Sequence, residues 1–285
     1  MSEQQASQEK SIGDIIRQTN NLNAAQMDQI VRYQQEQKVK FGEAAVALGL
    51  ATRDDVLWAL SQQFHYPYSS DSSERLATEL IVGRQPFSDE AEAFRDIRSQ
   101  LMASVLDPEG PTRALAVVSC EVGDGKSFFS ANIAIAFSQL GGRTLLVDAD
   151  MRTPRQHEIF GVPEIGSGLS TVLSGRAETN VIRPIVDLPN LYLLPVGVLP
   201  PNPLELVQRP AFGHLIAELG NKFDYVIVDT PASSHGSDAR VIAAKCGSAL
   251  VVSRKNKTRF SSTKKLLESL KRSKVNIAGL TLNDY

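Results

Sequence analysis

The sequence predicts an α/β protein with a mostly parallel, doubly wound sheet, preceded by a small all-α domain. Two observations predict the sheet: short apolar runs recur beyond Pro111, and helical patterns separate them. An internal repeat near the start of the chain predicts the helical domain. We expect residues 1–70 to form the helical domain, 71–87 a linker and 88–285 the α/β domain.

Length and composition exclude several classes of protein. The 285 residues suit two domains, and the formal charge of -2 excludes a surface built to coat nucleic acid, so no nucleic-acid partner is expected. No apolar run reaches the roughly 18 residues that a membrane span needs, and the first residues do not form a signal peptide. Two cysteines are too few for a disulfide framework or a zinc site, which predicts a reducing cytoplasm.

The internal repeat aligns residues 11–34 with residues 40–63 without gaps. Asn23 in the first unit matches Thr52 in the second, and each is a good N-cap ahead of an amphipathic run. Each unit therefore predicts two helices joined by a turn. The small polar residues of segment 69–75 then predict a linker.

Six apolar runs in the second half are expected to be buried strands of the sheet. They are residues 115–119, 144–148, 191–195, 225–229, 249–253 and 277–282. Helical patterns precede or separate them at residues 89–105, 127–140, 237–244 and 258–273. Strands that alternate with helices favour parallel pairing and helices on both faces of the sheet.

The first strand leads into the sequence CEVGDGKS at residues 120–127 and then into a helix, which is the arrangement of a P-loop NTPase. Lys126 is expected to contact the β and γ phosphates of ATP, and the Ser127 hydroxyl to bind Mg²⁺. A glycine-rich turn with an incidental lysine is the alternative. The predicted nucleotide-binding residues are Gly123, Asp124, Gly125, Lys126, Ser127, Phe128 and Asn283.

Carboxylates end two of the predicted strands. Asp148 and Asp150 follow one strand, and Asp229 follows another, at the sheet edge where ligands bind. One carboxylate could hold metal and one could accept a proton, although a solvated turn or a helix cap would use the same residues. The Asn283 amide is either a reader of the adenine edge or an ordinary turn residue.

Together these motifs resemble the bacterial tyrosine kinases. The resemblance covers about residues 88–285 and includes DADMR at 148–152, DTP at 229–231, EAFRDIR at 92–98 and LPPNP at 199–203. It is strongest to the EpsG-type chain-length determinant kinases of exopolysaccharide operons. It implies that Lys126 and Ser127 bind phosphates and Mg²⁺, that Asp148 is the base toward tyrosine, and that Asp150 and Asp229 organise Mg²⁺.

The resemblance also implies partners and an acceptor. A ring of subunits would form through Glu92, Arg95 and Arg98, which otherwise make a solvated charged face. Tyr285 is a candidate phosphoacceptor in an unusually short tail, with Tyr33, Tyr66 and Tyr68 as alternatives. The family implies a membrane polysaccharide co-polymerase whose cytoplasmic tail activates the kinase and holds it at the inner membrane.

Two alternatives stay open. Positioning ATPases share the fold, but their P-loop carries an additional lysine near its start, where this chain has Cys120, Glu121 and Val122. A nucleotide-dependent scaffold is the second alternative. The N-terminal repeat resembles the helical N-terminal domain of type II secretion and pilus ATPases, some of which bind cyclic di-GMP. Because the arginine that opens those binding units is missing, protein docking is favoured over cyclic di-GMP binding.

Overall fold

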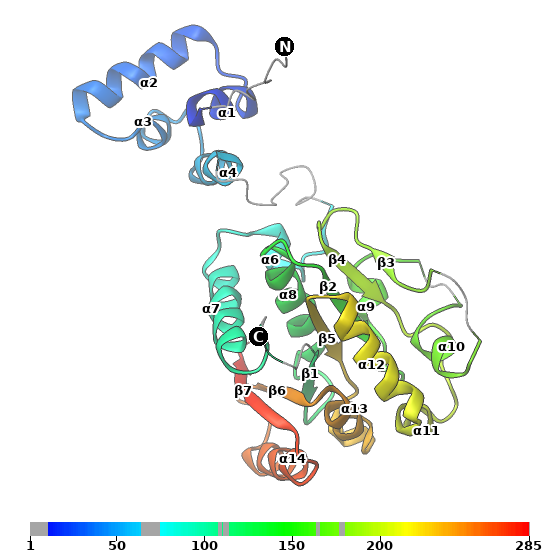
Figure 1. Cartoon of the computed structure of the whole chain (residues 1–285). Helices are drawn as coiled ribbons and strands as arrows, with labels where there is room; N and C mark the ends of the chain where they lie inside the picture. Colours follow the sequence, from blue (N-terminus) through cyan, green and yellow to red (C-terminus); the bar gives the residue numbers. More distant parts are fainter. Residues whose placement is uncertain are drawn as a thin grey trace. The chain divides into compact units, whose positions relative to one another are not determined.

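The computed structural model describes residues 11–63, 75–107, 110, 114–163, 166–176 and 180–284. The chain divides into two compact units, Met1–Ser70 and Asp71–Tyr285 (Figure 1). Each unit has its own hydrophobic core. Among the described residues, no helix is both long and apolar enough to cross a membrane.

The first unit contains four helices around a small core that includes Ile16, Ile30 and Ala59. The helices are α1 (Ile12–Thr19), α2 (Ala24–Gln37), α3 (Phe41–Ala47) and α4 (Arg53–Gln63). They form the two helix pairs that the internal repeat predicts.

Contacts between residues three apart fix the start of each helix in the first unit. In three of the four, each residue of the pair accepts a hydrogen bond from the other's backbone N–H, which is a capping box. In the third helix only the backbone N–H of Lys40 donates to Glu43, at 3.0 Å. The pairs are Ser11 with Asp14, Asn23 with Gln26, Lys40 with Glu43, and Thr52 with Asp55. The repeat therefore extends to the hydrogen bonds that begin its helices.

The second unit is built on a seven-stranded sheet of order β3-β4-β2-β5-β1-β6-β7. All neighbouring strands are parallel except β3 and β4. The strands are β1 (Ala114–Ser119), β2 (Thr144–Asp148), β3 (Arg183–Pro184), β4 (Leu191–Leu194), β5 (Tyr225–Asp229), β6 (Ser248–Arg254) and β7 (Asn276–Asn283). The six predicted strands are present, and β3 is an additional short edge strand.

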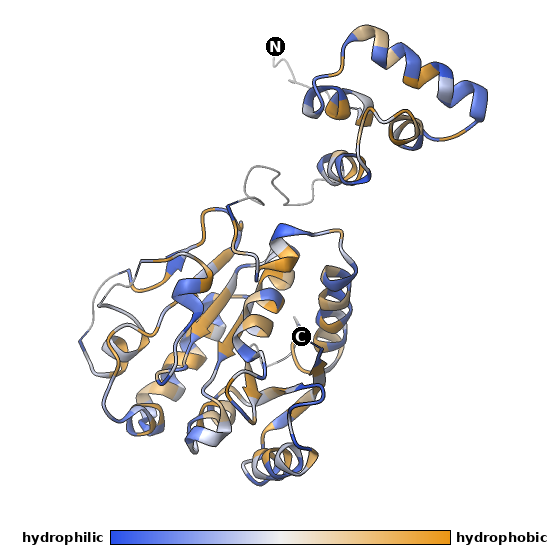
Figure 2. Ribbon diagram, turned by 180° about the vertical axis from the view of Figure 1, so that it is seen from behind, coloured by the Kyte–Doolittle hydropathy of each residue, from blue (hydrophilic) through white to orange (hydrophobic). Residues whose placement is uncertain are grey.

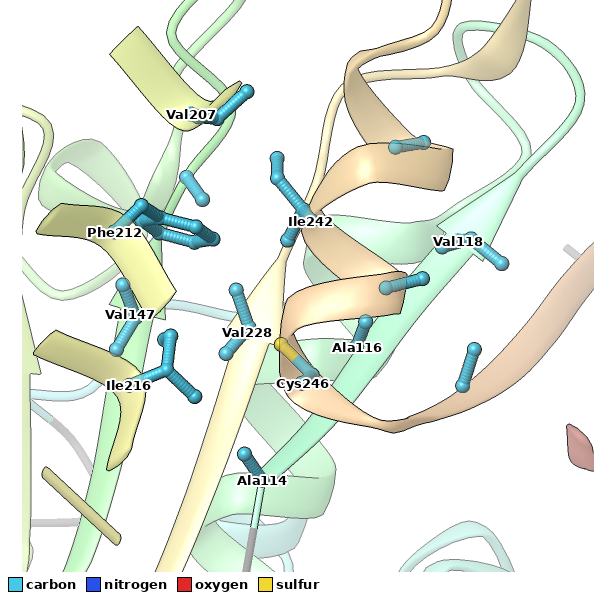
Figure 3. Packing of buried hydrophobic residues seen from close by; sticks show 14 of the residues in the cluster. Ala114, Ala116, Val118, Val147, Val207, Phe212, Ile216, Val228, Ile242 and Cys246 are labelled. Atoms are coloured by element: carbon cyan, nitrogen blue, oxygen red, sulfur yellow. The ribbon is translucent and has the colours of Figure 1, made fainter. Parts of the chain in front are cut away.

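Helices cover both faces of this sheet, which confirms the predicted doubly wound α/β class (Figures 1 and 2). Phe212, Ile216 and Ile242 pack on the face that presents Val147 and Val228 (Figure 3). The helices are α6 (Ile81–Arg84), α7 (Asp89–Ser104), α8 (Lys126–Ser138), α9 (Gln156–Ile159), α10 (Leu169–Leu173), α11 (Pro203–Gln208), α12 (Pro210–Lys222), α13 (Asp238–Cys246) and α14 (Phe260–Arg272), with a 3-10 turn, η1 (Ser233–His235).

The central strands explain why this architecture forms. Every residue of β1, β2 and β5 is buried, and their hydrophobic runs lie in the interior of the unit (Figure 2). Strands that are apolar on both faces need a layer of helices on each side. Helix α8 is buried along nearly its whole length, which fixes its first turn at the end of β1.

The linker predicted at residues 71–87 is too long at its C-terminal end. Leu80 and Val82 are buried in the core of the second unit. The Asn132 side chain of α8 accepts a hydrogen bond from the Val82 backbone at 3.0 Å and donates to the Glu79 carbonyl at 2.7 Å. These contacts make residues 79–87 part of the α/β unit, whereas residues 64–74 lie outside the described part of the chain.

Candidate active site

The loop between β1 and α8 has the backbone of a phosphate-binding loop. Gly123 and Gly125 have φ values of +84° and +92°, a region that favours glycine because a side chain there is strained. A Cβ on Gly125 would also lie 2.0 Å from the Asn283 Nδ2 atom. Helix α8 begins at Lys126 without a side-chain cap, so its first backbone N–H groups are available to an anion.

Asp124 turns its carboxylate inward and braces this loop. It is fully buried and accepts hydrogen bonds from the Glu121 backbone N–H at 2.9 Å and from the Thr258 hydroxyl at 2.7 Å. Its own carbonyl accepts from the Asn283 side chain at 3.2 Å. The predicted residues Asp124 and Asn283 therefore lie at the loop, where their observed contacts are with the protein itself.

Lys126 and Asp150 form a buried ion pair across the mouth of the loop, with Nζ and Oδ2 3.2 Å apart. Asp150 also accepts hydrogen bonds from the backbone N–H groups of Arg152 and Thr153 and from the Thr153 hydroxyl. The turn after β2 is thus organised around this carboxylate. A phosphate group that enters the loop offers Lys126 a second anionic partner.

Asp148 and Asp229 lie opposite each other at the ends of β2 and β5, as the sheet register requires. Both are fully buried. Burial and the negative charge of Asp229 raise the pKa of Asp148 well above its usual range, and Asp150 adds to this. Burial also raises the pKa of Asp229, against the lowering effect of the Lys126 ammonium.

Gln156, at the start of α9, joins these groups and was not among the predicted residues. Its backbone N–H donates to Asp148 at 3.1 Å, and its side-chain Nε2 donates to Asp229 at 2.7 Å and to the Ser127 carbonyl at 3.0 Å. The residue is fully buried. No sequence signal identifies it, because a glutamine eight positions after Asp148 belongs to none of the motifs considered above.

Arg152 makes a second contact that the sequence pattern did not reveal. Its guanidinium donates from Nε and Nη2 to the Asp238 carboxylate at 3.1–3.3 Å. Asp238 is the first residue of α13 and is almost fully buried. This pair connects the turn after β2 to α13, so it positions the segment that carries Asp150.

The donor set fits Mg²⁺ when a nucleotide is present. Within the described residues no three His, Cys, Asp or Glu side chains are grouped so that they could hold a metal ion. Mg²⁺ prefers oxygen ligands, keeps several waters and often uses one or two carboxylates together with substrate phosphates. Ser127, Asp150 and Asp229 supply such oxygens at the loop, and the Oε1 atom of Gln156 is a buried acceptor that lacks a hydrogen-bond donor among the described residues.

The residues predicted for ring assembly lie on α7. Glu92 is exposed and pairs with Arg95 at 2.7 Å. Arg95 also donates to the Pro86 carbonyl, and Arg98 donates to the Ala136 carbonyl of α8. Both arginines therefore help to attach α7 to its own domain.

Two further predicted residues have different outcomes. The Phe128 ring packs edge-on against Phe94 of α7, with ring centroids 6.0 Å apart, so its side chain takes part in core packing. Tyr285, the candidate phosphoacceptor, lies outside the described residues, as do Tyr66 and Tyr68.

The fold and the loop together define a P-loop NTPase. Residues 111–284 match the ParA family, described as NUBPL iron-transfer P-loop NTPase. The septum site-determining protein MinD from Pyrococcus horikoshii OT3, solved with Mg-ADP, superposes with a TM-score of 0.53 at 27% identity, over 61% of this chain and 71% of MinD. The architecture therefore supports nucleotide and Mg²⁺ binding in general.

Within that class the chain belongs to the bacterial tyrosine kinases. It is 33% identical to the tyrosine-protein kinase CpsD of Streptococcus agalactiae over 67% of this chain and 82% of CpsD. The kinase domain of the Escherichia coli tyrosine kinase ETK superposes with a TM-score of 0.67 at 29% identity, over 76% of this chain and 88% of that domain. Some related tyrosine kinases are longer, and the chain spans 28% of their length.

These findings confirm the predicted family, the P-loop fold and the enzyme class, a protein-tyrosine kinase. The catalytic roles of Lys126, Asp148 and Asp150 stay predictions, as do the metal-binding roles of Ser127 and Asp229. Their shared position at one sheet edge is the basis for the proposal that follows.

Proposed function

We propose that the protein is an ATP- and Mg²⁺-dependent tyrosine autokinase that regulates the polymerisation, chain length and export of an exopolysaccharide together with a membrane partner. The observation that carries the chemical part is the convergence of Lys126, Asp148, Asp150 and Asp229 on the phosphate loop. The family supports the biological part.

The phosphate loop and Lys126 bind the nucleotide in this proposal. The first backbone N–H groups of α8 bind phosphate oxygens, and Lys126 leaves Asp150 to follow the charge of the transferred phosphoryl group. Bound Mg²⁺ supplies charge neutralisation at the phosphates, held through Ser127, Asp150 and Asp229. Burial of the site strengthens each of these electrostatic contacts.

Asp148 is the proposed proton acceptor for the tyrosine hydroxyl. The raised pKa of Asp148 makes its ionised form a stronger base than an exposed carboxylate. Hydrogen bonds from the backbone N–H groups of Asp150 and Gln156 stabilise that ionised form and fix its orientation. A general base of this kind contributes a factor of about 10² to 10⁴ to the rate.

The proposed acceptor is Tyr285. The preceding residue, Asp284, pairs with Lys255 at 2.6 Å, and the Asn283 carbonyl accepts from the Lys255 backbone at 2.9 Å. These contacts hold the end of β7 beside the phosphate loop, so delivery of Tyr285 to a neighbouring subunit requires their release. Tyr33, on α2, is the described alternative acceptor.

Assembly and location complete the proposal. A ring of subunits forms through the face of α7 that presents Glu92, and the N-terminal helical unit docks a protein in preference to cyclic di-GMP. The partner is a membrane polysaccharide co-polymerase whose cytoplasmic tail activates the kinase. The protein is then cytoplasmic and peripherally associated with the inner membrane.

Site-resolved mass spectrometry after incubation with Mg²⁺ and ATP tests the kinase assignment, with the protein alone and fused to a candidate partner tail. Lys126→Met should abolish phosphotyrosine, because it removes the cation at the transferred phosphate. Lys222→Met, at an exposed lysine of α12, is the matched control and should leave phosphorylation intact. ATP hydrolysis without phosphotyrosine in the fused protein would instead support a positioning ATPase.

A further inference from the structure

The side chain of Gln156 is oriented by two acceptors. Its Nε2 atom donates to the Asp229 carboxylate at 2.7 Å and to the Ser127 carbonyl at 3.0 Å. The opposite orientation of the amide would place its oxygen against these same two acceptors, which offer it no hydrogen. The contacts therefore fix which end of the amide carries the oxygen.

That oxygen, Oε1, is the unexplained atom of the site. It is fully buried, and no residue in the described ranges donates a hydrogen bond to it. Buried acceptors in proteins normally have a donor, and an exception calls for a missing partner. The partner has to be a donor that enters with the ligand, because the nearby carboxylates Asp148 and Asp229 are arranged as acceptors.

We propose that Gln156 is a positioning residue for the metal–nucleotide complex, in which Oε1 accepts a hydrogen bond from a water molecule bound to Mg²⁺. The inference rests on the proposed Mg²⁺–ATP site. Mg²⁺ keeps several waters when it binds proteins, and each is a hydrogen-bond donor. The same amide would then orient the Asp229 carboxylate through Nε2 and the hydration shell through Oε1.

The backbone allows a clean test of this role. The Gln156 main-chain N–H donates to Asp148 and does not depend on the side chain. Gln156→Met keeps that contact and most of the side-chain volume, but removes both the amide donor and the amide acceptor. Gln156→Glu keeps an acceptor oxygen while it removes the donor.

Gln139 is a matched control on the same helix as Lys126. It follows the last residue of α8, its Nε2 donates to the Val82 carbonyl at 3.2 Å, and its Oε1 is also buried without a donor among the described residues. Gln139→Met thus deletes an equivalent amide at the opposite end of the helix. A general loss of stability would affect both variants, whereas a role at the metal would affect Gln156 alone.

The experiment measures binding of Mn²⁺ to the protein–ADP complex by electron paramagnetic resonance, and binding of ADP alone in EDTA. We expect Gln156→Met to weaken Mn²⁺ binding about 10- to 100-fold, the range for loss of a group that orients metal ligands. Metal-free ADP binding should not change. Gln156→Glu and Gln139→Met should bind Mn²⁺ at least as well as the wild-type protein.

Several outcomes would overturn the inference. These are unchanged Mn²⁺ affinity in Gln156→Met, an equal loss with and without metal, a loss in Gln156→Glu as large as in Gln156→Met, or no Mn²⁺–ADP binding by the wild type. An effect seen only when a tyrosine peptide is present would assign the missing donor to the acceptor hydroxyl instead. If the Mn²⁺ results hold while no tyrosine is phosphorylated, the kinase proposal fails and the role of Gln156 stands.

Discussion

The N-terminal helical unit and the phosphate-binding edge of the sheet are organised by contacts of very different sequence separation. Each helix start in the helical unit is fixed by residues three apart, such as Asn23 and Gln26. At the sheet edge, the Gln156 side chain bonds to Asp229, 73 residues away, and Thr258 bonds to Asp124, 134 residues away. The first kind of contact is written in the local sequence, whereas the second exists only after the sheet has formed.

The largest expected effect at the sheet edge comes from Asp148→Asn. If Asp148 is the base, the turnover rate should fall by about 10² to 10⁴. The nucleotide-free protein should nevertheless become more stable at neutral pH, because folding raises the pKa of this buried carboxyl. Phosphotransfer assays and urea unfolding from pH 4 to 8 measure the two effects.

The sign of the pH dependence follows from that raised pKa. The native state holds the proton more tightly than the unfolded chain, so the stabilisation is complete below the ordinary carboxyl range. It is lost as the pH rises through the raised pKa, and Asp148→Asn should remove this loss. Asp150→Asn, two residues away, is the contrast: it leaves the buried Lys126 without its anion and should destabilise the protein. Equal changes in both variants would contradict this account.

The difference in contact range explains which parts of the structure could be predicted. Six strands and the loop at residues 120–127 were predicted because apolar runs and glycine positions are local patterns. Helices α11 and α12 were not, because Pro203 and Pro210 look like chain breaks but lie in the first turn of each helix, where no N–H is needed.

The candidate site divides in the same way. Lys126 and Asp229 stand in recognisable motifs, so the sequence was sufficient to find them. Gln156 and Asp238 are ordinary polar residues until the chain brings them to Ser127 and Arg152. Their importance depends on tertiary geometry, which no local pattern in a single sequence encodes.

Gly125→Ala should give the second largest effect, since it strains the loop in two ways. The residue has a φ of +92°, and a Cβ would lie 2.0 Å from Asn283 Nδ2. Backbone strain of this kind costs about 1–3 kcal/mol, which corresponds to a loss of about 10- to 100-fold in ADP affinity if it is relieved only by moving the loop. Isothermal titration calorimetry with ADP measures the loss.

Gly141→Ala separates the two causes of that strain. Gly141 has a similar φ of +88°, but a Cβ there meets no atom within 4 Å. It should cost some stability and leave ADP affinity unchanged. Gly125→Ala combined with Asn283→Ala should recover part of the affinity, because only the contact is removed. Failure of the double variant to recover any affinity would show that φ alone controls the loop.

The smallest expected effect is Asn23→Ala in the helical unit. It removes the side-chain acceptor for the Gln26 backbone N–H and should lower the free energy of unfolding by about 1 kcal/mol. Trp58, the only tryptophan of the chain, lies on α4, so its fluorescence reports this unit in the full-length protein. Gln29→Ala, an exposed change within α2, is the control and should have little effect. Because the lost contact is local, ADP affinity should not change in either variant, and a drop in ADP affinity with Asn23→Ala would show that the two units are energetically coupled.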